Sequence, residues 1–134
     1  MRAALIGLVV TVLSFPALGQ SAAEKQAAIA AAFETALREN TVFLNCSATE
    51  PESHKVYIKT WDDMVARSID HLVRGNADAA FVAKLRARAA YAAVMRLDAP
   101  LREIVALCEG DWPDRFVMDE YVKLDRRIAE ILGR

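Results

Sequence analysis

Apolar residues recur every three or four positions in five successive segments of this chain. The last segment shows the spacing most clearly, with Val117, Tyr121, Leu124, Ile128 and Ile131 alternately four and three residues apart. This spacing places side chains on one face of a helix, whereas a half-buried strand alternates every second residue. No segment of the sequence sustains such a two-residue alternation, so the pattern predicts an all-α fold.

Capping and breaking residues divide the chain into helices. Ser21, with a glutamate three positions later, forms a capping box that starts a first helix, which we expect to run through about Asn45. Thr49 is the expected cap of a second helix, with Pro51 in its first turn. Gly75 is the expected end of that helix because glycine tolerates the backbone geometry of helix ends.

Asn76 is the expected cap of a third helix, whose apolar stripe consists of Phe81, Leu85, Ala89, Ala92 and Met95. Pro100 and Gly110 are expected to bound a short fourth helix, and Pro113 marks the opening of the last one. Short connections between amphipathic helices make antiparallel neighbours. The sequence therefore predicts a small up-and-down bundle of four main helices plus one short helix.

The third helix has two further features. Its small residues Ala89, Ala90, Ala92 and Ala93 would let a neighbouring helix approach closely. The run from Lys84 to Arg88 is the main basic concentration in the chain. A solvated outer face explains such a run, and docking of an acidic protein partner is the alternative.

Residues 1–19 have the pattern of a cleavable secretory signal. An arginine near the start is followed by about 13 apolar residues, then by Pro16 and the small residue Gly19. A transmembrane anchor is the alternative, but spanning a bilayer takes roughly 20 apolar residues. We expect cleavage before Gln20, no stable membrane anchor afterwards, and a single domain of residues 20–134 in the periplasm or outside the cell.

Cys46 and Cys108 are the two cysteines of the chain, and both lie in the mature part. In an oxidising compartment, two cysteines and no others most simply form one intrachain disulfide. Two free thiols or pairing between chains are the alternatives. An intrachain bond would staple the bundle by closing a loop of about 62 residues.

The charge of the chain argues against nucleic acid as a partner. Removal of Arg2 with the leader leaves 16 of the 17 basic residues against 18 acidic ones, a net charge of −2. Proteins that bind phosphate backbones carry a basic excess instead. The length of the mature chain suits one domain with a single core.

The two histidines, His54 and His71, restrict the chemistry that the chain can perform. They lie 17 residues apart on one expected helix, or about 25 Å, so they cannot share a metal ion or a proton. Ser53 next to His54 is more typical of a helix start than of a nucleophile. The sequence also lacks haem-attachment, zinc and phosphate-loop motifs, and we expect no catalytic residue, metal or cofactor.

Four side chains are candidate contacts for a protein partner: Trp112, Tyr57, Trp61 and His54. Aromatic residues anchor many interfaces. At helical spacing, however, Tyr57 and Trp61 are more typical of a core, as is Tyr121. Trp112 precedes a proline in a connection and is therefore the best candidate for exposure.

The absence of a reactive constellation favours a non-enzymatic, exported protein that binds another protein, as an inhibitor, immunity protein, chaperone or envelope subunit. The alternative is a bundle that binds a small molecule or a metal, or an enzyme whose carboxylates converge only in the fold. The sequence leaves the oligomeric state open.

Overall fold

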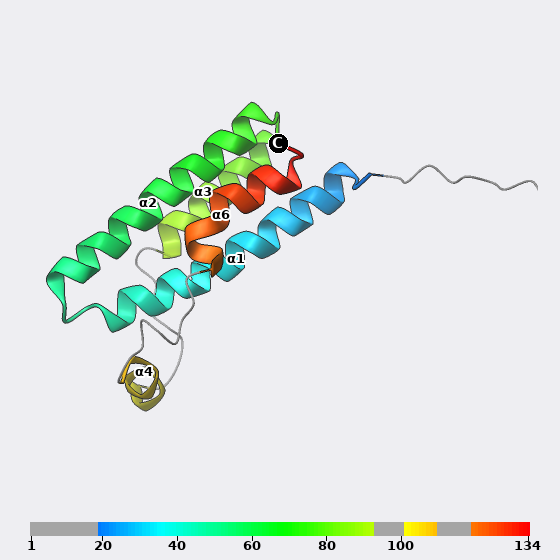
Figure 1. The fold of residues 1–134 in the computed structure, drawn as a ribbon. Helices are drawn as coiled ribbons and strands as arrows, with labels where there is room; N and C mark the ends of the chain where they lie inside the picture. Colours follow the sequence, from blue (N-terminus) through cyan, green and yellow to red (C-terminus); the bar gives the residue numbers. More distant parts are fainter. Residues whose placement is uncertain (1–18, 93–100, 110–118) are drawn as a thin grey trace, which may run out of the picture.

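The computed structural model describes residues 19–92, 101–109 and 119–134 (Figure 1). Its helices are α1 (Ala22–Cys46), α2 (Pro51–Arg74), α3 (Ala79–Ala92), α4 (Leu101–Cys108) and α6 (Asp119–Ile131). The described residues contain no strand. The predicted all-α bundle is confirmed, while the predicted leader and the predicted opening at Pro113 lie outside the described residues.

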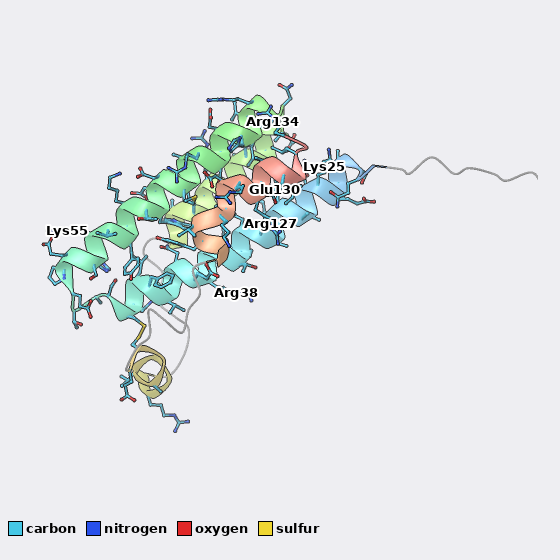
Figure 2. All side chains as sticks on the ribbon, viewed as in Figure 1. Lys25, Arg38, Lys55, Arg127, Glu130 and Arg134 are labelled. Carbon is cyan, nitrogen blue, oxygen red and sulfur yellow. A yellow bond between two sulfur atoms is a disulfide. The ribbon has the colours of Figure 1, made fainter. Side chains whose placement is uncertain are left out.

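The long helices α1 and α2 run in opposite directions and form the frame of the bundle (Figure 1). Helix α6 packs against both of them, and α3 also contacts both. Helix α4 lies beside the carboxyl end of α1, outside the bundle formed by the other helices (Figure 1). Lys25 and Lys55 mark the opposite ends of this bundle (Figure 2).

The capping box at the start of α1 is confirmed. The Ser21 hydroxyl accepts a hydrogen bond from the Glu24 backbone N–H at 3.1 Å, and the Ser21 N–H donates to the Glu24 carboxylate at 3.3 Å. At the start of α2, Pro51 occupies the first turn as predicted, but the predicted cap at Thr49 is wrong. Glu50 holds the cap position instead, and its side chain makes no capping bond in the described chain.

The end of α2 corrects the predicted role of Asn76. Gly75 ends the helix as predicted, and Asn76 follows it in the left-handed region, with φ of 53°. The N–H groups of Asn76 and Ala77 donate to the Val73 and Leu72 carbonyls, which is the pattern of a Schellman motif. Asn76 therefore closes α2, and the cap of α3 is Asp78, whose carboxylate accepts from the Phe81 N–H at 2.9 Å.

The core is centred on a group of aromatic rings contributed by α1, α2 and α6. Trp61 stacks on Tyr121 with ring centroids 5.8 Å apart, and it meets Phe33 edge to face at 5.9 Å. The Tyr121 hydroxyl donates to the backbone carbonyl of Tyr57 at 2.7 Å. Burial raises the pKa of the Tyr121 phenol, which keeps this donor protonated. The hydroxyl thus joins α6 to α2 inside the core.

Polar contacts between distant segments fix the helices relative to one another. The Glu39 carboxylate of α1 accepts from the Tyr121 N–H at 2.7 Å, in the first turn of α6, and thereby caps that helix. Arg88 of α3 makes two hydrogen bonds to Glu34 of α1, at 2.8 and 3.1 Å. The Arg88 guanidinium holds the pKa of the Glu34 carboxyl below its usual value. Both contacts join helices that are far apart in sequence.

Asn40 is a polar exception in the core. Its side chain is fully buried in α1, and its amide oxygen and nitrogen have no hydrogen-bond partner among the residues that the structure describes. A buried polar group without a partner costs about 1–3 kcal/mol. The leucine side chain is similar in size to that of asparagine but has no polar atoms. We therefore expect Asn40→Leu to raise the free energy of unfolding by about 1 kcal/mol or more.

Urea denaturation of the two proteins measures this difference. Asn40→Ala serves as the control because it removes the same amide but leaves a cavity, which offsets the gain. A loss of stability in Asn40→Leu would show that the amide is satisfied in solution.

Candidate functional site

The candidate partner contacts occupy different environments. Trp61 is 2% exposed and belongs to the core, as its helical spacing indicated. Tyr57 is partly buried and stacks on Phe43 with ring centroids 4.9 Å apart. Trp112 lies outside the described residues. The structure therefore does not bring the candidate contacts together on one described surface.

His54 packs at the junction between α1 and α2. Its Nδ1 atom lies 3.0 Å from the hydroxyl of Ser47, which is fully buried and itself donates to the Phe43 carbonyl at 2.6 Å. Whichever of the two atoms carries the shared proton, the Ser47 hydroxyl is fully buried and lies within bonding distance of a backbone carbonyl, so it is not placed to act as a nucleophile. This pair is a structural link between two helices.

The predicted disulfide between Cys46 and Cys108 is confirmed, with a Cα–Cα distance of 5.1 Å. Figure 2 shows it joining the carboxyl end of α1 to α4. Both cysteines are the last residues of their helices, where the helix dipole disfavours a thiolate. Redox-active cysteines are instead found where their thiolates are stabilised. The bond therefore suits a structural link, and it indicates an oxidising compartment.

A groove of about 630 Å³ runs between α2 and α3. We call it the α2/α3 groove, and its lining residues are Trp61, Asp62, Val65, Ala66, Ile69, Asp70, Val73, Arg86, Ala89 and Ala90. Ile69 and Ala89 are buried at its floor, whereas Ala66 and Ala90 are exposed. The exposed lining residues leave the groove open to solvent. The short side chains of Ala66 on α2 and of Ala89 and Ala90 on α3 do not fill the space between the two helices.

The apolar surface of the groove extends along α2. Val73 is 54% exposed at one end of it. Ile58 is 41% exposed and precedes Val65 and Ile69 by seven and eleven residues, spacings that put it on the same face of the helix. Between these two exposed side chains, Val65 is half-buried and Ile69 is buried, so this face exposes its large apolar side chains mainly at its two ends. Exposed apolar side chains that border a groove are characteristic of interaction surfaces.

Charged residues border the groove on both sides. Asp62 and Asp70 lie on α2 and Arg86 lies on α3. Asp70 pairs with Arg74 at 2.7 Å on the exposed surface. Asp62 and Arg86 have no ion pair within the described part of the chain. An acidic border along α2 therefore faces a basic residue on α3.

A second depression, of about 550 Å³, lies between α1 and α6. Its lining residues are Ala28, Ala31, Ala32, Thr35, Arg127, Glu130 and Ile131. Ile131 is the one large apolar side chain among them, and it is only partly exposed. This depression therefore offers less apolar contact than the α2/α3 groove does.

Sequence reasoning did not identify the α2/α3 groove. It noted the alanines of α3 and the basic run that contains Arg86, which are two of its components. Val65 and Ile69 of α2 pack in or against the core. The groove arises because the neighbouring positions on α2 and α3 carry short side chains, and only the packing of the two helices brings those positions together.

The residues that the structure describes hold no cluster of three or more histidine, cysteine, aspartate or glutamate side chains suited to a metal ion. None of their helices combines the length and the apolar character needed to cross a membrane.

Comparison of the chain with protein-family models, with curated proteins and with solved structures finds no match. Fold and site together define the class of the protein. It is a small all-α bundle, linked by one disulfide, with an apolar groove between two of its helices.

Proposed function

We propose that this chain is an exported, non-enzymatic protein that binds another protein through the α2/α3 groove. The groove is the observation that carries the proposal, because its lining combines apolar side chains from α2 and α3 with charged borders. Export is supported by the signal pattern of residues 1–19 and by the disulfide. The mature protein would then act in the periplasm or outside the cell.

The shape of the groove favours a protein over a small molecule. Small-molecule sites enclose most of the ligand and direct several polar groups toward it. Here the exposed residues Asp62, Ala66, Asp70 and Ala90 leave the groove open, and its charges lie at the border. Asp62 and Asp70 are two turns apart on one helix, or about 12 Å, so the two carboxylates cannot hold one metal ion.

Site-specific photo-crosslinking tests the proposal in intact cells. A photoreactive residue is placed at Ala66 or Ala90 in the groove, and at Ala87 or Thr35 in two controls. Ala87 is exposed on α3 but does not line the groove, and Thr35 lines the depression between α1 and α6. We expect one protein adduct of defined mass from the two groove positions and not from the controls.

The same cells test the export step. The crosslinked protein is expected in the periplasmic fraction or the medium, with a sequence that begins at Gln20. A chain that begins at Met1 in the cytosol would overturn the export step. Absence of any adduct at the groove positions, or the same adduct from all four positions, would overturn the binding step.

A further inference from the structure

We infer that the occupant of the α2/α3 groove is an amphipathic α-helix of the partner, with basic residues on the flank above α2 and an acidic residue on the flank above α3. This inference rests on the proposed function and names the chemistry of the partner. Three observations support it: the backbone of the groove walls, the length of the groove along α2 and the arrangement of the border charges.

The walls of the groove are both helices, and this restricts the conformation of the occupant. The backbone groups within α2 and α3 are bonded inside each helix, so they offer no edge to which an extended peptide could add as a strand. An extended segment would place its own N–H and C=O groups against Val65, Ile69 and Ala89 without partners. A helix satisfies its backbone internally and therefore fits this surface.

The size of the groove suits one helix. The residues of α2 that line the groove extend from Trp61 to Val73, twelve residue steps or about 18 Å, which corresponds to roughly three turns of an occupant. Ala66 and Ala90 are exposed on opposite walls and allow an approaching backbone to come close. Recognition of an amphipathic helix by an apolar groove is a recurrent binding mode, with anchors at helical spacing.

The border charges specify the flanks of that helix. Asp62, which has no ion pair within the described part of the chain, matches a basic residue on the partner. A second basic residue seven or eight positions further along would face Asp70, whose exposed carboxylate also pairs with Arg74. Arg86 on the opposite border matches an acid. A second copy that placed its α2 in the groove would bring its own Asp62 and Asp70 against the same acids, which disfavours that arrangement. Anionic lipid is disfavoured for the same reason.

Synthetic peptides test the inference with the mature, disulfide-bonded protein. The first probe is a peptide of about 18 residues with leucine on one face, lysine on one flank and glutamate on the other. The second probe replaces the lysines with glutamate, and the third places proline in the centre of the first. We expect the first peptide to bind, the second to bind roughly tenfold more weakly and the third not to bind.

Variants of the protein locate the binding. The double variant Asp62→Lys/Asp70→Lys should bind the second peptide, with glutamate in place of lysine, more tightly than the first. Ala90→Trp fills the groove and should abolish binding of the first peptide, while Ala87→Trp on the same helix should leave it unchanged. Fluorescence anisotropy measures each affinity, circular dichroism verifies that every variant is folded, and sedimentation gives its oligomeric state.

Several results would overturn the inference. They are equal binding of the first two peptides, binding of the proline peptide, or no binding of the first peptide. A dimer that Ala90→Trp dissociates would identify a second copy as the occupant instead. If any of these results accompanies a groove-specific crosslink, the partner is not a helix of the stated charge pattern, while the proposed function stands.

Discussion

Replacement of both Cys46 and Cys108 by serine is expected to lower the free energy of unfolding of the domain formed by residues 20–134 by about 4 kcal/mol. The disulfide joins residues 62 positions apart, and the entropy that it removes from the unfolded chain grows with the length of that loop. Domains of this size are stable by about 5–15 kcal/mol in total. Loss of the bond should therefore lower the melting temperature by roughly 15 °C.

Urea denaturation followed by circular dichroism measures this loss. The wild-type protein in a reducing agent should match the double serine variant, because both lack the same covalent link. The contacts of α6 with α1 and α2 do not involve the disulfide, so the reduced protein should keep most of its helical signal. A loss below about 1 kcal/mol would contradict the prediction and indicate that the reduced, unfolded chain already holds the two segments together.

The helices could be predicted because their signals are local. The capping bonds of Ser21 and Glu24, the place of Pro51 in a first turn and the apolar stripe of α6 each depend on residues within a few positions of one another. Tyr121, Leu124 and Ile128 are all fully buried, as their alternating spacing indicated. Prediction of the disulfide required only the number of cysteines in the chain and the inference of an oxidising compartment.

Both errors at helix ends occur where two nearby residues compete for one capping position. Asn76 fits the start of a helix through its side chain, and it also fits a helix end because asparagine tolerates the left-handed region. The neighbouring Asp78 decides between these roles by capping α3 itself. At the start of α2, Thr49 and Glu50 compete for one position, and the chain places Glu50 there although threonine is the better cap.

Contacts between distant segments could not be predicted from the sequence. The carboxylate of Glu39 caps a helix that starts eighty residues later, and Arg67 of α2 pairs with Asp125 of α6 at 2.9 Å. Neither pair carries a pattern that one sequence reveals. The α2/α3 groove belongs to the same class, since it exists only where two helices leave a space between short side chains.

A substitution of Trp61 tests whether the aromatic residues on α2 belong to the core or to a partner interface. We expect Trp61→Ala to lower the free energy of unfolding by about 3–5 kcal/mol. Its side chain is 2% exposed and contacts Phe33 and Tyr121 in the centre of the core. The substitution removes these contacts and leaves a cavity. The three surrounding helices could close this cavity only by giving up other packing contacts.

Val56 supplies the matched control for Trp61. It lies on the same helix but is 61% exposed, so Val56→Ala should change the stability by less than about 0.5 kcal/mol. Urea denaturation of both variants gives the comparison. Should Trp61→Ala remain as stable as the wild type while it loses the groove-specific crosslink, Trp61 would be an interface residue. A large loss of stability would instead assign it to the core, and apolar contact with a partner in the groove would then come from other lining residues such as Val65 and Val73.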